Sequence, residues 1–139
     1  MISVFIDANI FLEIFLAQKK KEKCVELLEK IKNGKIVAFT SNFIVFGVSL
    51  ILEKYAKKPE EIKSVIENLF SIDNLKIYDL TPSDLIDATK LMKKYGLGLE
   101  DSLCLQGAVI NNSERLVSFD KDFDKVTYIK RTEPSELLK

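Results

Sequence analysis

The stretch that decides the fold is Met1-Ile-Ser-Val-Phe-Ile-Asp7-Ala-Asn9. Its apolar run from Ile2 to Ile6 is interrupted by one serine and is rich in β-branched and aromatic residues. This pattern predicts a strand buried on both faces at the centre of a parallel sheet. Ligands of open α/β sheets gather at the carboxyl ends of the strands, so Asp7 and Asn9 are expected where chemistry occurs. The alternative role for Asp7 is to cap the helix that begins near Ile10.

Length and composition limit what the chain can be. With 139 residues, residues 1–139 are expected to form a single domain with one core. Lysine plus arginine equals aspartate plus glutamate at 21 each, so no global basic field draws the protein to nucleic acid. Histidine is absent, which leaves carboxylates, and therefore hard divalent ions, as the natural site chemistry. Cys24 and Cys104 fall in apolar helical patterns and are expected to be small core residues.

The chain shows no targeting or membrane-spanning pattern. The longest apolar run, Phe43 to Leu52, is about half of the roughly 20 residues that cross a bilayer. No stretch resembles a signal peptide. We therefore expect a cytoplasmic protein with no membrane segment.

Short apolar runs alternate with helical patterns along the chain. The helix starts and stops are clear in places: Thr81-Pro-Ser-Asp84 combines a hydroxyl cap, a proline and an acid, and Gly96 ends the helix that follows. This alternation predicts a three-layer α/β/α sandwich with a mostly parallel central sheet of four to five strands. The strands after the first are expected at Ile36–Phe39, Lys76–Tyr78, Leu116–Asp120 and Val126–Ile129.

Two helical segments carry more apolar surface than one face of a small sheet covers. Phe43 to Leu52 is apolar on nearly every face, and Ile62 to Phe70 shows an apolar stripe. Exposed apolar patches of several hundred Å² are uncommon on soluble monomers. We therefore expect a homodimer, or a complex, that draws its contact from these two helices.

Acidic residues stand at the ends of three separated elements. Asp7 ends the first strand, Asp101 enters a helix after a glycine-flanked loop, and Asp120 and Asp122 follow the fourth strand. Gathered in one cleft, these carboxylates would repel one another unless they shared a cation. Mg²⁺ or Mn²⁺ fits such a site and can activate a water molecule toward a phosphodiester. The sequence therefore predicts a metal site built on Asp7, Asp101 and Asp120.

Three motifs resemble those of PIN-domain ribonucleases, and the resemblance covers essentially the whole chain. They are Asp7-Ala-Asn9-Ile-Phe, Glu100-Asp101-Ser102-Leu103 and Leu116-Val-Ser-Phe-Asp120-Lys-Asp122-Phe123. The resemblance implies an endoribonuclease that uses Mg²⁺ or Mn²⁺ to cut RNA by water attack. Many small members are toxins of the VapC type, each paired with an antitoxin that covers the cleft.

The resemblance also implies a role for each acidic or polar residue of the motifs. Asp7, Asp101 and Asp120 correspond to catalytic metal carboxylates, and Asp122 to a further metal or supporting acid. Asn9 and Ser118 correspond to polar neighbours that orient the carboxylates.

One position departs from the family pattern. The family usually has a glutamate on the helix that follows the second strand, where this chain has Gly47. Glu53 lies six residues later, about 240° around the helix, and cannot replace it. Glu100, beside Asp101, is the other nearby acid. We expect Gly47 to face the cleft, with close helix packing as the alternative.

Two other functions come into consideration. The second hypothesis is a PIN-fold protein that has weak or no nuclease activity and binds protein or RNA. A phosphatase of the haloacid-dehalogenase type is disfavoured because this chain has Asn9 where such an enzyme needs an aspartate.

Overall fold

A parallel sheet of five strands forms the centre of the computed structural model, which describes all 139 residues. The strand order is β3-β2-β1-β4-β5, and every neighbouring pair is parallel. The predicted fold class, an α/β sandwich around a parallel sheet, is confirmed. The strands are β1 (Ser3–Ile6), β2 (Val37–Ser41), β3 (Leu75–Tyr78), β4 (Arg115–Val117) and β5 (Lys130–Thr132).

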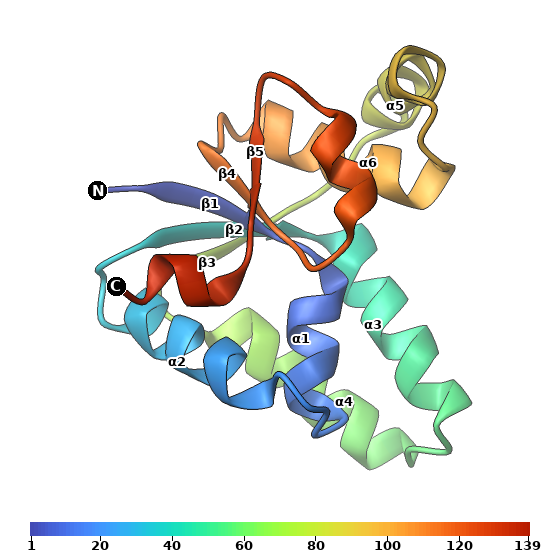
Figure 1. Ribbon diagram of the computed structural model, residues 1–139. Coiled ribbons are helices and arrows are strands. Elements are labelled where there is room, and N and C mark those ends of the chain that lie inside the picture. The colour runs from blue at the N-terminus through green and yellow to red at the C-terminus, as the bar shows by residue number, and fades with distance from the viewer.

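Helices cover both faces of the sheet. Figure 1 shows α1, α2 and α4 on one side and α5 with α6 on the other, while α3 extends from the carboxyl edge. No helix has both the length and the apolar content that crossing a bilayer requires. The helices are α1 (Ala8–Phe15), α2 (Lys21–Lys32), α3 (Asn42–Lys54), α4 (Pro59–Ser71), α5 (Pro82–Tyr95) and α6 (Leu99–Ile110), and two 3₁₀ turns span Lys121–Lys125 and Pro134–Leu137.

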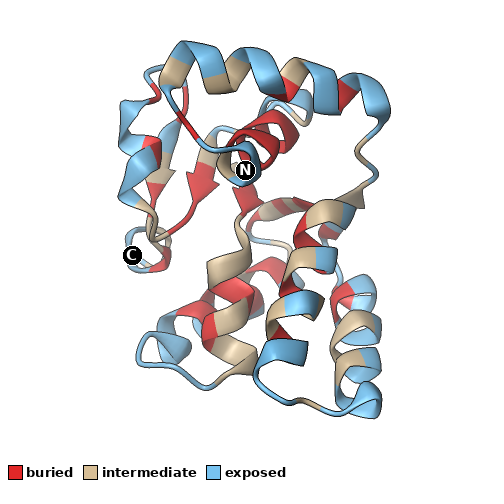
Figure 2. Cartoon of the chain, turned by 90° about the vertical axis from the view of Figure 1, so that its right-hand side faces the viewer, coloured by how far each residue is buried: buried red, intermediate tan, exposed pale blue.

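The first strand lies at the centre of the sheet, as its sequence predicts. Val4, Phe5 and Ile6 are fully buried, and β1 pairs with β2 on one side and β4 on the other. In Figure 2 the buried residues concentrate along the sheet and on the inner faces of the helices, and the exposed ones lie outside. Helix α6 approaches β1 closely because residue 107 is glycine: a Cβ there would lie 2.6 Å from Cζ of Phe5. This approach brings the start of α6 to the end of β1.

The end of the chain differs from its sequence-based expectation. The strand predicted at Val126–Ile129 is wrong: β5 lies at Lys130–Thr132, after the 3₁₀ turn Lys121–Lys125 and a bend. Val126 and Ile129 are buried, but Tyr128 is 51% exposed. The two apolar side chains are therefore core anchors of an irregular segment. Likewise, the fourth strand ends at Val117, so the residues up to Asp120 are free to form the loop of the site.

Candidate metal centre in an acidic cleft

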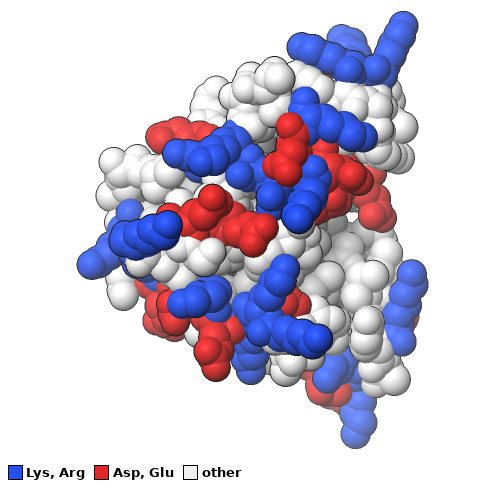
Figure 3. Space-filling view, viewed as in Figure 1, with Lys and Arg blue, Asp and Glu red and all other residues white.

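An acidic cleft lies at the carboxyl edge of the sheet. It is a cavity of about 390 Å³ between the starts of α1 and α6, the helix α3 and the loop after β4. In Figure 3 acidic side chains gather on the right of the molecule beside a hollow. The polar residues that line the cavity include Asp7, Asn9, Glu53, Lys54, Glu100, Asp101 and Asp120.

Asp7 is both a helix cap and a member of the cleft. Its Oδ1 accepts a hydrogen bond of 2.7 Å from the N–H of Ala8, which satisfies the first turn of α1. Its Oδ2 accepts from the Ser118 hydroxyl at 2.6 Å and from Asn9 Nδ2 at 3.3 Å. Burial raises the pKa of Asp7, although the hydrogen bonds from Ser118 and Ala8 oppose the shift. The two roles considered for Asp7 therefore coexist in one side chain.

Asn9 and Ser118 join the two ends of the chain. Asn9 Nδ2 donates to Ser118 Oγ at 3.2 Å, and Asn9 Oδ1 accepts from the N–H of Phe119 at 3.4 Å. Ser118 Oγ also accepts from the N–H of Asp120 at 3.0 Å. This network fixes the loop after β4 relative to the end of β1, so Asp7 and Asp120 are held in one arrangement. Both residues that the sequence marks as polar neighbours contact the acids directly.

Asp101, Asp120 and Asp122 form the tightest acidic group. One carboxylate oxygen from each lies within 4.8 Å of the others. Asp120 Oδ1 accepts from the N–H of Asp122 at 2.9 Å, which caps the 3₁₀ turn and brings Asp122 back toward the cleft. Asp122 is exposed, yet its carboxylate belongs to this group. Asp7 lies in the same cavity beside the group.

The acids of the cleft are electrostatically unsatisfied. Burial raises the pKa of Asp101 to about 6, and the nearby carboxylates of Asp120, Asp7, Asp122 and Glu100 add to the shift. None of the ion pairs in the structure involves any of these five residues. Such a group of unpaired carboxylates would attract a cation.

The geometry fits a hard divalent ion. Mg²⁺ bonds oxygen at about 2.1 Å, so two ligands on opposite sides of one ion lie about 4.2 Å apart. Adjacent ligands of an octahedral ion lie about 3.0 Å apart. The carboxylate oxygens of Asp101, Asp120 and Asp122, all within 4.8 Å of one another, would therefore converge on one ion through modest side-chain shifts. All donors are carboxylate oxygens, which Mg²⁺ and Mn²⁺ prefer to softer ligands.

Gly47 lines this cavity on the side of α3. A Cβ at this position would meet no atom within 4 Å, so the glycine is not required for close helix packing. The packing explanation considered from the sequence is therefore wrong. Glu53 borders the same cavity, but it lies about 9 Å further along the helix axis.

Arg131 is a residue of the site that sequence reasoning missed. Its Nη1 donates to the carbonyl of Ser118 and to Glu133 Oε2, both at 3.0 Å. Its Nε donates to Asp124 Oδ1 at 2.8 Å. Arg131 thus braces both ends of the loop that carries Asp120. It lies on the short edge strand β5, and no motif or apolar pattern in the sequence marks it.

Comparisons with known proteins agree with this fold. The model of the PIN domain matches residues 4–128. Ribonuclease VapC6 of Methanocaldococcus jannaschii is 26% identical, over 91% of this chain and 94% of its own. Among solved structures, the Sarcin-Ricin loop cleaving toxin VapC20 of Mycobacterium tuberculosis superimposes with a TM-score of 0.73 at 13% identity, covering 91% of this chain and 97% of its own. A toxin-antitoxin complex from Klebsiella pneumoniae gives a TM-score of 0.70 at 17% identity, covering 94% and 97%.

Proposed function

The chain belongs to the PIN-domain family, and we propose on this premise that it is an endoribonuclease that hydrolyses RNA phosphodiester bonds in the acidic cleft. One observation carries the proposal: three carboxylates lie within 4.8 Å of one another, with no basic side chain paired to them, at the carboxyl edge of a parallel sheet. Ligands of such sheets bind at that edge.

We assign the metal site to Asp101, Asp120 and Asp122, with Asp7 as the fourth acid. Either Mg²⁺ or Mn²⁺ suits these ligands, and a bound ion supplies charge neutralisation and a water molecule of lowered pKa. Ser118 and Asn9 donate hydrogen bonds to Asp7 Oδ2 and so fix the orientation of its carboxylate.

The side chains around the acids have supporting roles in the proposal. Glu100 adds negative charge beside Asp101 and strengthens the attraction for a cation. Lys54, on the wall formed by α3, offers a positive charge to an RNA phosphate that enters the cleft. An RNA hydrolase of this kind would act in the cytoplasm, where its substrate is found.

Gly47 keeps a second function open. The family position of the helix glutamate is empty of any side chain, which removes one negative charge from the cleft. A protein with weak metal binding could serve as an RNA- or protein-binding module of the same fold. The activity assay below separates the two.

An antitoxin is the proposed protein partner. The relative from Methanocaldococcus jannaschii is named a VapC ribonuclease, and one structure with this fold is a toxin-antitoxin complex. We propose that a cognate antitoxin covers the acidic cleft of this protein in the same way that the family resemblance implies.

A homodimer is also proposed, with a revised contact surface. Val45 and Leu52 are buried within the chain, and Ile62, Val65 and Ile66 of α4 pack against the core. One patch of apolar side chains that stay exposed lies on α3 and α5, beside a cavity of about 270 Å³ that Phe46 and Leu85 line. The patch consists of Phe46 (61% exposed), Leu50, Leu85 and Ile86.

Sedimentation tests this surface. Phe46→Lys places a charge in it, so a dimer of the wild-type chain should dissociate to a monomer at micromolar concentration. A wild-type chain that sediments as a clean monomer would rule the dimer out.

Cleavage of mixed RNA with and without Mn²⁺ tests the function. Wild-type protein should cut RNA only when Mn²⁺ is present. The Asp7→Asn variant should not cut RNA under either condition. Asp73→Asn, which changes an exposed acid far along the chain, is the matched control and should cut like the wild type. Metal-independent cleavage, or equal cleavage by Asp7→Asn, would contradict the proposal; no cleavage with retained RNA binding would favour the binding module.

A further inference from the structure

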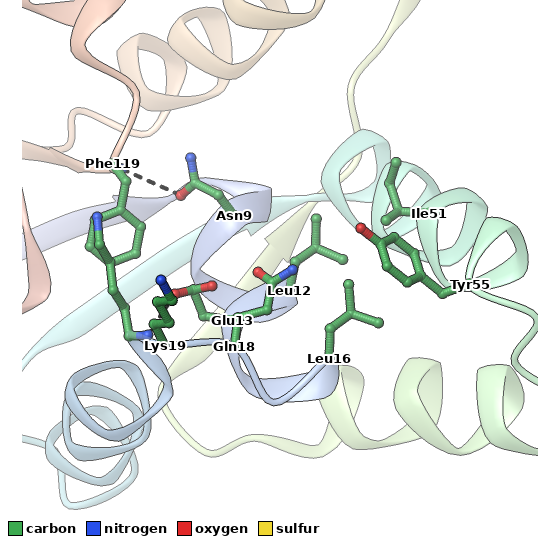
Figure 4. A pocket seen from close by; sticks show the side chains of 10 residues that line it. Asn9, Leu12, Glu13, Leu16, Gln18, Lys19, Ile51, Tyr55 and Phe119 are labelled. Atoms are coloured by element: carbon green, nitrogen blue, oxygen red, sulfur yellow. Dashed lines mark hydrogen bonds between the residues drawn. The ribbon is translucent and has the colours of Figure 1, made fainter.

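A second cavity of about 540 Å³ adjoins the acidic cleft. It lies between α1, the loop into α2, the end of α3 and the residue before Asp120. Asn9, Leu12 and Ile51 line both cavities, so the two spaces are continuous along one wall. Figure 4 shows Phe119 at one end of this second cavity, Tyr55 and Ile51 at the other, and the α1 side chains between them.

The second cavity combines an aromatic ring with positive charge. The Phe119 ring is partly exposed, and its backbone N–H donates to Asn9 Oδ1, which fixes its position next to Asp120. The ammonium of Lys20 lies 4.2 Å from the centroid of this ring. Lys19 is exposed at the same rim, while Leu12 and Leu16 supply apolar surface.

We infer that this second cavity binds one nucleotide of a single-stranded RNA substrate, with its base stacked on Phe119 and its phosphate paired with Lys20 or Lys19. The inference rests on the proposed ribonuclease function, for which it supplies a subsite beside the cleft. Bases of single-stranded RNA stack on aromatic side chains while lysines follow the backbone.

The balance of charge favours RNA over an apolar peptide. The acids of the cleft repel every phosphate other than the one that a bound ion would hold, so the rest of an RNA strand needs positive charge directly outside the cleft. Lys19 and Lys20 provide that charge within the cavity that continues from the cleft. The one acid that lines this cavity, Glu13, is buried, and its Oε1 accepts a hydrogen bond from the N–H of Lys20, so the two exposed lysines outnumber it. The contact of an exposed lysine with a ring is weak, so a base can replace the ammonium on Phe119 and leave Lys20 free for the phosphate.

Kinetics of the Phe119→Leu variant give the first test. Leucine keeps apolar volume but removes the aromatic face, so KM for RNA should rise by about tenfold while kcat stays nearly constant. Phe119→Tyr should restore the wild-type KM because it restores the ring. Phe70→Leu, which changes a 59% exposed phenylalanine on α4, is the matched control and should leave KM unchanged.

Abasic substrates show whether a base is the group that Phe119 contacts. In a short RNA, one base at a time is removed on either side of the scissile bond. At one position, loss of the base should weaken wild-type binding by about tenfold and leave Phe119→Leu unaffected, because the lost interaction is the same. At every other position, both proteins should respond equally.

The subsite can fail independently of the nuclease activity. Anisotropy of a labelled RNA in the Asp101→Asn background reports binding without cleavage, whether or not the wild type cuts RNA. If Phe119→Leu binds RNA as tightly as its parent in that background, or if no abasic position is coupled to residue 119, the subsite is overturned and the cavity fits a protein segment better. Loss of cleavage alone, with the coupling intact, would instead contradict the ribonuclease function.

Discussion

Two aspartates occupy the same position in neighbouring helices and have opposite environments. Asp84 is the third residue of α5 and Asp101 the third residue of α6. Asp84 Oδ2 accepts from the N–H and hydroxyl of Thr81 and from the hydroxyl of Tyr78, at 2.9 to 3.0 Å. Its pKa is lowered, chiefly by the backbone N–H of Thr81. The pKa of Asp101 is instead raised to about 6 by burial and by its acidic neighbours.

The residue before each helix explains the difference. Threonine caps α5 and forms a reciprocal pair with Asp84, whereas Gly98 caps α6 without any side-chain hydrogen bond. The carboxylate of Asp101 therefore has no partner of its own and faces the cleft. In this chain the first-turn acid that follows a threonine cap is hydrogen-bonded to that cap, and the one that follows a glycine is left free for the cleft.

The largest expected effect comes from exchanging each acid for its amide. Asp101→Asn should reduce Mn²⁺-dependent RNA cleavage by at least about 100-fold, because the proposed metal site loses one of its carboxylates. Asp84→Asn should leave cleavage within a factor of about two but lower the free energy of unfolding by about 1–2 kcal/mol, because a charged acceptor of three hydrogen bonds is lost. Cleavage rates and denaturant melts of both variants check this. Lost cleavage in Asp84→Asn together with normal cleavage by Asp101→Asn would contradict the roles assigned to the two residues.

Adding a carboxylate to the cleft should strengthen its binding of Mn²⁺. Gly47→Glu introduces an acid where a Cβ meets no atom within 4 Å, so Mn²⁺ affinity should rise several-fold. Replacing the glycine in the helix interior should also raise the free energy of unfolding by up to about 1 kcal/mol. Gly47→Ala is the control, because it should gain the same stability without adding an acid. Equal Mn²⁺ affinities of the two variants would show that residue 47 has no bearing on the metal.

A hydroxyl before Asp101 should convert it toward the behaviour of Asp84. The backbone of Gly98 (φ −69°, ψ 170°) suits any residue, and a Cβ there is unobstructed. Gly98→Ser offers Asp101 a partner that competes with the cleft, so Mn²⁺ affinity should fall by about threefold to tenfold. Gly98→Ala, which lacks the hydroxyl, should bind Mn²⁺ like the wild type when both are titrated by calorimetry.

The smallest expected effect is on the pH dependence of stability without metal. The pKa of Asp101 rises from 3.8 to about 6 on folding, so the folded state holds its proton more tightly. Its contribution to stability is fully present below pH 3.8 and is lost as the pH rises through 6, a loss of about 1 kcal/mol after solvent screening. Melts between pH 4.5 and 7.5 in EDTA should show this loss in the wild type and a smaller one in Asp101→Asn. An equal loss in both proteins would refute the assignment.

Much of this arrangement could be predicted from the sequence because local patterns determine it. The buried run before Asp7 identified the central strand, and the cap of α5 was explicit in Thr81-Pro-Ser-Asp84. Asp7 and Asp120 were expected at one edge because parallel strands end at the same side of a sheet, and Asp101 was expected beside them at the start of a helix. Their roles as metal ligands stay a proposal.

What the sequence did not reveal depends on contacts between distant residues. Strand β5 has three polar residues, Lys130 to Thr132, and no apolar period, so only its pairing with β4 defines it. Arg131 braces the loop of Asp120 through backbone and side-chain contacts that no spacing encodes. The place of Asp122 in the acidic group depends on one backbone hydrogen bond to Asp120.

Calorimetric titration of Mn²⁺ at pH 6, in two buffers with different heats of ionisation, tests the central claim that Asp101 is held without a partner for a metal ion. Asp101, with a pKa of about 6, is half protonated under these conditions, and burial also raises the pKa of Asp7, so metal binding should release at least about half a proton. Asp84→Asn should behave like the wild type. Asp101→Asn should bind Mn²⁺ more weakly and release fewer protons. Undiminished affinity and proton release in Asp101→Asn would contradict the account.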